Sequence, residues 1–117
     1  MPENGATGRR LTLAVEHFSN AVVVRCSGRL VAGVHNDFYA DVKQLFPGNQ
    51  RIVLDFAELS HMDSLGLGTL VRLYVSAKSA GCVLELCNVG KSVRQLLGIT
   101  HVWSIFGSVG ENNIRTG

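Results

Sequence analysis

The spacing of apolar residues changes along the chain, and each spacing predicts a different secondary structure. Residues 11–15 alternate between apolar and other side chains, which is the period of a half-buried strand. Residues 21–27 predict a second strand, which Gly28 either ends or kinks. A turn at residues 18–20 joins the two, so they should be antiparallel neighbours. Residues 29–31 predict a short third strand.

A helical period covers residues 34–46. Its apolar residues recur three or four positions apart, and polar side chains occupy the other face. The helix should begin near His35 or Asn36 and end at Pro47-Gly48, because proline and glycine both interrupt helices.

The most informative part of the chain is its middle. A β-branched and aromatic run at residues 51–56 predicts a strand buried on both faces. Polar residues at 55–60 then predict the end of this strand and a turn. A second helical period follows, from Leu67 to Ala77, and Gly81 is placed to close that helix as its C′ glycine.

The start of this second helix carries polar residues and glycines. Asp63 or Ser64 is where an N-cap belongs, since either side chain can accept from the free N–H groups of the first turn. Gly66 and Gly68 each cost roughly 1 kcal/mol against alanine inside a helix. They are either simple packing glycines or sites where another backbone approaches the helix closely.

The last part of the chain continues the alternation of strands and helices. Residues 82–87 predict a strand, residues 93–97 a short helix and residues 102–106 a last strand. This order predicts a single α/β domain with a mixed β-sheet, parallel central strands and helices mainly on one face. Functional sites in such sheets form at the carboxyl ends of the strands, where Ser64 is placed.

Composition supports one folded domain. The chain has 117 residues, of which 46% are hydrophobic, enough for a core. We expect the domain to cover residues 11–106, between a mobile tail at residues 1–10 and a polar tail at residues 107–117.

Charge and hydropathy exclude several classes of protein. A net charge of +2 without a cluster of Lys or Arg argues against a direct nucleic-acid partner. The sequence lacks both the roughly 20-residue apolar run of a membrane span and the apolar core of a signal peptide. Its three cysteines have no framework spacing, which fits reduced thiols. We therefore expect a cytoplasmic protein.

A specific motif lies at the start of the second helix. Residues 62–68 read M-D-S-L-G-L-G and follow V-L-D-F-A-E-L-S-H at residues 53–61. These stretches resemble the signature of the STAS domain family, in particular its bacterial anti-sigma factor antagonists. The resemblance extends more weakly over residues 11–106. It implies the small α/β fold described above, with a serine, here Ser64, that a partner anti-sigma kinase phosphorylates.

The resemblance also implies a partner-binding surface around this serine. Its residues would be Asp63, Ser64, Leu65, Gly66, Leu67, Arg29, Val31 and His61. The protein would be a non-enzymatic module without a cofactor, because the kinase activity and its ATP belong to the partner, an anti-sigma factor and serine protein kinase. It would act as a monomer or weak dimer in sigma-factor-dependent transcription during stress.

Electrostatics explains how a phosphate on Ser64 would act. It adds about −1.5 to −2 charges at neutral pH. The helix dipole favours an anion there by about 0.3–1 kcal/mol, and the charge of Asp63 opposes it by a similar amount, so the fold should survive. Against a docked partner, like charges cost several kcal/mol, and about 1.4 kcal/mol is tenfold in affinity. Phosphorylation would therefore switch binding off.

Other interpretations remain open from the sequence. Ser64 could simply cap the helix, and Asp63 could be a solvated turn carboxylate. The domain could be a subunit or regulatory module of a lipid-transport or other signalling assembly, without a phosphate switch. An enzyme is the remaining alternative, because His61, Asp63 and Ser64 are the residue types of a catalytic triad. Residues so close in sequence rarely converge as a triad requires, and Met62 stands where a nucleophile elbow needs glycine.

Two stretches depart from the family pattern. Val31 stands where many antagonists carry an acidic residue, which would alter the partner surface. Residues 111–117 lack the apolar repeat of the final amphipathic helix that family members usually carry.

The remaining histidines and cysteines form no ligand set. Cys82 and Cys87 lie on one predicted strand, where their spacing places them on opposite faces. His17, His35 and His101 are scattered along the chain and are expected at the surface. The sequence predicts no metal site.

Overall fold

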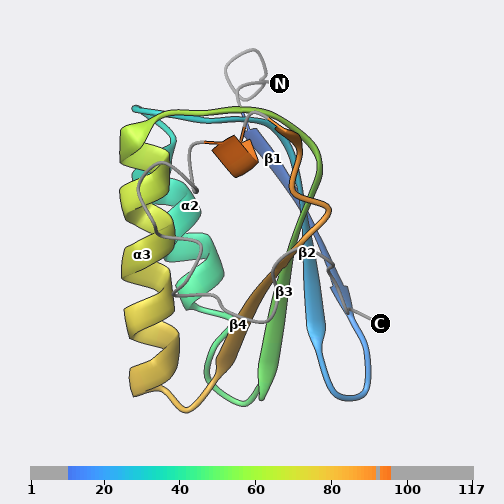
Figure 1. The fold of residues 1–117 in the computed structure, drawn as a ribbon. Helices are drawn as coiled ribbons and strands as arrows, with labels where there is room; N and C mark the ends of the chain where they lie inside the picture. The colour runs from blue at the N-terminus through green and yellow to red at the C-terminus, as the bar shows by residue number, and fades with distance from the viewer. Residues whose placement is uncertain (1–10, 92, 96–117) are drawn as a thin grey trace, which may run out of the picture.

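A sheet with helices packed against one face makes up the part of the protein that the structure describes (Figure 1). The computed structural model describes residues 11–91 and 93–95. The elements are β1 (Leu11–His17), β2 (Val22–Leu30), α2 (His35–Lys43), β3 (Arg51–Met62), α3 (Ser64–Ser79) and β4 (Val83–Cys87). The strand order is β1-β2-β3-β4, with β1 antiparallel to β2 and the other pairs parallel. The predicted mixed sheet, with parallel central strands and helices on one face, is confirmed.

The second strand is longer than predicted because Gly28 kinks it rather than ending it. Gly28 has a φ of 109°, a conformation that glycine adopts without a steric penalty. The register with β3 shifts on both sides of this glycine, and pairing then resumes. The separate strand predicted at residues 29–31 is therefore wrong, since Arg29 and Leu30 still belong to β2.

The predicted end of the central strand at residues 55–60 is also wrong. β3 continues to Met62. Among the described strands, its second half pairs only with β2, because the pairing with β4 covers only the first half. Fewer neighbouring strands cover this half, so polar side chains on it can be exposed to water. Glu58 and Ser60 are exposed, whereas Leu59 between them is buried.

Helix α2 confirms the predicted helical period, but it spans only His35–Lys43, so the predicted end at Pro47-Gly48 is wrong. Phe38 and Val42 are buried on its inner face. The helix starts at His35, after Val34 at the N-cap, which makes no side-chain cap bond. Gly48, with a φ of 84°, follows its end.

Helix α3 ends at the predicted glycine. Gly81 has a φ of 74°. Its N–H donates to the carbonyl of Lys78 at 3.2 Å, and the N–H of Cys82 donates to the carbonyl of Ala77 at 2.8 Å. These two bonds form a Schellman motif, which turns the chain from α3 into β4.

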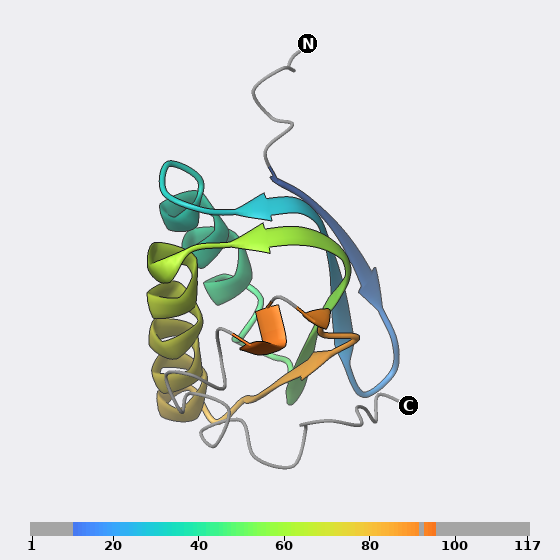
Figure 2. The same cartoon turned by 45° about the horizontal axis from the view of Figure 1, so that its top comes forward.

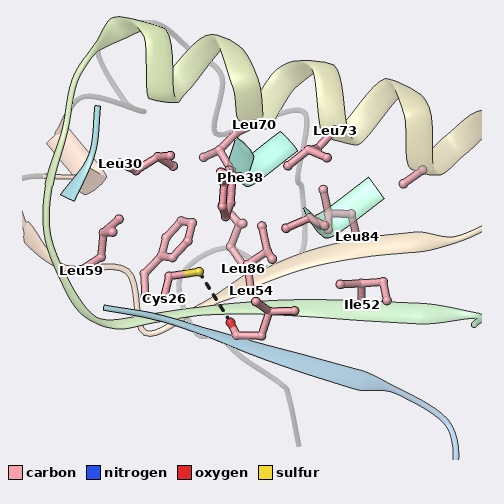
Figure 3. Close-up of a cluster of buried hydrophobic side chains, with 14 of the residues drawn as sticks. Cys26, Leu30, Phe38, Ile52, Leu54, Leu59, Leu70, Leu73, Leu84 and Leu86 are labelled. Carbon is pink, nitrogen blue, oxygen red and sulfur yellow. Dashed lines mark hydrogen bonds between the residues drawn. The ribbon is translucent and has the colours of Figure 1, made fainter. Parts of the chain in front are cut away.

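The core fills the space between the sheet and the two helices (Figure 3). Its labelled members are Cys26, Leu30, Phe38, Ile52, Leu54, Leu59, Leu70, Leu73, Leu84 and Leu86. Burial of one such large apolar side chain contributes about 1.5–3 kcal/mol relative to an exposed one. This layer holds α3 against the sheet, and it thereby sets the position of the start of α3 against the ends of β2 and β3.

Several predictions concern residues outside the described ranges. These include the last strand at residues 102–106, both tails, His101 and the missing final helix. Residues 91 and 93–95 are helical, and Val93 is buried, as the predicted short helix requires. Among the helices within the described ranges, none has the length and apolar character needed to cross a membrane.

Candidate functional site

The ends of β2 and β3 meet where helix α3 begins (Figure 2). In the parallel ladder, Arg29 lies opposite His61 and Leu30 opposite Met62. At this edge, β2 leads into the loop before α2, and β3 leads into α3. The carboxyl ends of parallel strands are where sites form in α/β sheets. Segments far apart in the sequence can therefore act together at this junction.

Asp63 ties the junction together through both oxygens of its carboxylate. Its Oδ1 accepts a hydrogen bond from the N–H of Gly66 at 2.9 Å, so Asp63 is the N-cap of α3. Its Oδ2 accepts from the N–H of Ala32 at 2.9 Å, in the loop after β2. The N–H of Asp63 donates to the carbonyl of Leu30 at 3.3 Å. One residue thus fixes the first turn of α3 to the end of β2.

These contacts stabilise the ionised form of Asp63. The N–H groups of Ala32 and then Gly66 hold the pKa of its carboxyl below the usual value, and an electrostatic interaction with nearby His35 adds a smaller lowering. His35 is half-buried at the start of α2. Asp63 is therefore negatively charged at neutral pH before any modification of the site.

Ser64 is the first residue of α3, and it is exposed. Because Asp63 supplies the N-cap, the alternative in which Ser64 caps the helix does not hold. Leu65 beside it is 48% exposed, unusually open for a leucine in a helix that packs on a sheet. The first turn of α3 thus presents a hydroxyl and an apolar side chain to solvent.

The two glycines of the motif have different surroundings. A Cβ at Gly66 would collide with the carbonyl oxygen of Leu30 and would come within 2.9 Å of Leu30 Cγ. The prediction of close backbone approach is confirmed at this position. At Gly68, by contrast, a Cβ would have no neighbour within 4 Å among the described residues, so no other part of the described chain approaches the helix there.

The other predicted partner-binding residues divide into surface and interior. Arg29 and His61 are exposed and adjacent across the ladder, and Val31 is half-buried in the loop that follows. Gly66 is buried, and Leu67 is only 7% exposed. These last two lie beneath the surface that the others form. That the set contacts a partner stays a prediction.

Ala32 and His35 belong to the site, although the sequence did not indicate them. Ala32 acts through its backbone N–H, and it lies 31 positions from Asp63. No local pattern predicts such a bond. His35 was expected at the surface, but its Nδ1 is buried and has no hydrogen-bond partner among the described residues. Only the folded arrangement of α2 reveals its proximity to Asp63.

Other kinds of chemistry find little support in the described residues. Within this part of the chain, His61, Asp63 and Ser64 share no hydrogen bond, and the Asp63 carboxylate is engaged by backbone N–H groups instead. No group of three or more metal-ligating side chains gathers there. Cys26 and Cys82 are buried free thiols, as is Cys87, whose pKa burial raises to about 11.

A hollow of about 550 Å³ lies away from the junction. It opens beside the turn between β1 and β2, where Phe18 and Asn20 line it, and it reaches Asp55 and Asn88. None of the predicted partner-binding residues lines it. Ser64 and this hollow are therefore separate features.

Two bacterial relatives are similar to this chain in sequence. A STAS-domain containing protein of Pseudomonas aeruginosa is 27% identical over 85 residues, which are 73% of this chain and 84% of that protein. An anti-sigma F factor antagonist of Paenibacillus polymyxa is 28% identical over 97 residues, 81% of this chain and 83% of the relative.

Solved structures and a family model agree with these similarities. The anti-sigma factor antagonist SpoIIAA in its unphosphorylated form matches with a TM-score of 0.68 at 21% identity, covering 78% of this chain and 82% of that one. The phosphorylated form of this Bacillus protein matches at 0.63 and 21%, covering 76% and 83%. At such identity the likeness shows the fold. The model of the STAS domain matches residues 12–115, most of the sequence. The chain therefore belongs to the STAS domain family.

Proposed function

We propose that this protein is an anti-sigma factor antagonist whose partner leaves when Ser64 is phosphorylated. The observation that carries the proposal is the exposed Ser64 in the first turn of α3, directly after a cap supplied by Asp63. Two comparisons support it. The Paenibacillus relative is named an anti-sigma F factor antagonist, and SpoIIAA is known in an unphosphorylated and a phosphorylated form.

The fold should tolerate a phosphate on Ser64. A helix start favours an anion by about 0.3–1 kcal/mol. The ionised Asp63 beside it opposes the new charge by a comparable amount. The cap does not depend on the Ser64 hydroxyl, because Asp63 accepts the hydrogen bond from the first turn. Phosphorylation should therefore leave the domain folded and change only what binds over it.

The unmodified surface suits a protein partner. Leu65 offers an exposed apolar side chain at its centre, and Arg29 and His61 lie at the adjoining strand ends. A partner seated here would desolvate Ser64. A phosphate at this place would then face the interface, where a like-charge contact costs several kcal/mol. Since about 1.4 kcal/mol is tenfold in affinity, one phosphate is enough to release the partner.

In this scheme the protein performs no chemistry of its own. The anti-sigma factor supplies the kinase activity and the ATP, and the antagonist, in the cytoplasm, frees a sigma factor by occupying it. Val31, where the family pattern favours an acidic residue, lies in the loop that Asp63 holds through Ala32. An apolar side chain there points to a partner with a matching apolar contact.

The test combines intact-mass analysis with binding. Protein purified from its native cells should carry a phosphate that Ser64→Ala removes. The co-purifying anti-sigma factor should bind Ser64→Asp at least about tenfold more weakly than the wild type. Ser19→Asp is the matched control, because Ser19 is exposed at the opposite end of β2. It should bind like the wild type.

Two results would count against the proposal. Equal binding of wild type and Ser64→Asp would remove the switch. Absence of phosphate on Ser64 under all growth conditions, with some other assembly co-purifying, would favour a STAS module of a transport or signalling complex instead.

A further inference from the structure

Helix α3 carries an exposed stripe that its packing on the sheet does not use. Leu65, Gly68, Arg72 and Val75 follow one another three or four residues apart, so they share one helix face. All four lie outside the core, and the buried residues of α3 occupy the opposite face. Leu65 is 48% and Val75 57% exposed. The stripe begins beside Ser64 and is about 15 Å long at the usual helical rise.

Contacts within the described part of the chain do not explain the glycine at position 68. A Cβ there would meet nothing within 4 Å, in contrast to Gly66, whose Cβ would collide with Leu30. Glycine inside a helix is unfavourable relative to alanine. What glycine does provide is bare backbone on the outer face, between the exposed side chains of Leu65 and Arg72. This arrangement permits the close approach of another chain.

The stripe is also positively charged. α3 contains Arg72 and Lys78 and no acidic residue. The Arg72 guanidinium lies 4.1 Å from the centre of the Tyr39 ring, and Lys43 lies 5.5 Å from the same ring. The Tyr39 hydroxyl shares a 2.7 Å hydrogen bond with Ser76, which fixes the ring. The contact with this ring therefore restrains the Arg72 side chain within the stripe.

Acidic side chains of α2 do not neutralise this charge directly. Asp37 and Asp41 are four residues apart and lie on one side of α2. Tyr39 and Lys43, also four apart, lie on the side that faces α3. A partner lying on the stripe would meet Arg72 and Lys43 before it met either aspartate.

We propose that this stripe docks an acidic amphipathic helix of the anti-sigma factor, so that the binding surface extends from Ser64 along α3. The inference rests on the proposed function. Helices pack by fitting ridges into grooves, and Gly68 provides a gap in the ridge between Leu65 and Arg72. Charge complementarity selects carboxylates on the partner. A second copy of this chain is disfavoured, because Arg72 of each copy would enter the same interface.

An acidic partner helix also accounts for the effect of phosphorylation. The phosphate would appear at the end of the stripe, beside a helix that carries carboxylates. Repulsion between them would weaken binding without any change of shape in this protein.

Site-specific photo-crosslinking in native cells tests the inference. The photoreactive p-benzoylphenylalanine replaces Leu65, Val75 or, as a control, Val83, which is 54% exposed on β4. The variants at 65 and 75 should capture the same anti-sigma factor, and the peptide captured at 75 should be an acidic helix. The variant at position 83 should not capture the anti-sigma factor or its acidic helix.

A second measurement uses Gly68→Ala in the Val75 crosslinking variant. The added methyl should raise the melting temperature by about 4 °C and lower partner affinity about tenfold, because it overfills a close contact. A less stable protein could lose binding by unfolding, but a more stable one cannot.

The outcomes separate the two proposals. Capture at 65 but not at 75, capture of a second copy at 75, or unchanged capture in Gly68→Ala would overturn the stripe and leave the proposed function standing. Capture of no anti-sigma factor at either position would overturn both.

Discussion

The same substitution at two neighbouring glycines of α3 should change stability in opposite directions. In Gly66→Ala, the methyl would collide with the backbone carbonyl of Leu30 and lie 3.1 Å from Met62 Cγ. In Gly68→Ala, the methyl would meet nothing within 4 Å. The difference lies entirely in the surroundings, since both residues belong to the same helix.

The expected magnitudes follow from competing contributions. Alanine is favoured over glycine inside a helix by about 1 kcal/mol, and both variants gain this. Gly66→Ala also overpacks the junction, at about 1–3 kcal/mol. The obstacle is a backbone oxygen that accepts from Asp63 N–H at 3.3 Å, and disturbing this bond costs about 1 kcal/mol more. We expect Gly66→Ala to lose about 2 kcal/mol and Gly68→Ala to gain about 1 kcal/mol.

Urea unfolding followed by circular dichroism measures both changes. The midpoints should move in opposite directions while the slope stays constant, which shows that the native and unfolded states keep their exposed areas. A Gly66→Ala protein as stable as the wild type would show that α3 can move away from β2 without penalty. That result would refute the conclusion that close contact between Gly66 and Leu30 fixes the start of α3.

Three further sites test other parts of the structure by the same assay. Asp63→Ala should cost at least about 1 kcal/mol, because it loses the cap and also the hydrogen bond from Ala32. Asp63→Asn keeps the cap but loses the hydrogen bond from Ala32. The wild type should therefore be more stable than this variant at neutral pH. The difference in stability should disappear as the pH falls through the lowered pKa of Asp63, because only the ionised carboxylate gains these contacts. Tyr39→Phe should cost about 0.5–1.5 kcal/mol, and Ser76→Ala should add little in that background. Phe38→Ala, in the core, should cost about 3–5 kcal/mol.

Much of the fold could be predicted because its signals are local. The short turn before residue 21 leaves β1 and β2 no arrangement but antiparallel pairing. Gly81 follows the last turn of α3 and adopts the positive φ that a C′ residue needs. In both cases the residues that decide the structure lie within a few positions of one another.

The second half of β3 could not be predicted because its polar residues have two possible explanations. Glu58 and Ser60 are typical of a turn, but they also suit a strand that, among the described elements, pairs with β2 and exposes these two side chains. Whether these residues form a turn or a strand depends on β4, whose pairing stops halfway along β3. The same holds for Gly28, whose kink is visible only once β3 provides a partner on both sides of it.

The motif indicated the candidate site, but not which of its residues caps the helix. The sequence allowed either Asp63 or Ser64 to cap α3. Asp63 takes the role because its two oxygens can serve two N–H groups at once, one in α3 and one in the loop after β2. A serine hydroxyl has a single oxygen, so both N–H groups would have to converge on the same atom.

This division has a consequence for the proposed switch. A carboxylate held by two backbone N–H groups cannot swing away when a phosphate arrives on the next residue. The charges of Asp63 and phosphorylated Ser64 would therefore add, to about −2.5 to −3 at one helix start. A partner surface that tolerates one fixed negative charge would meet nearly three. A mobile carboxylate could have relieved this repulsion by moving away. Because Asp63 is held in place, the repulsion is relieved when the partner dissociates.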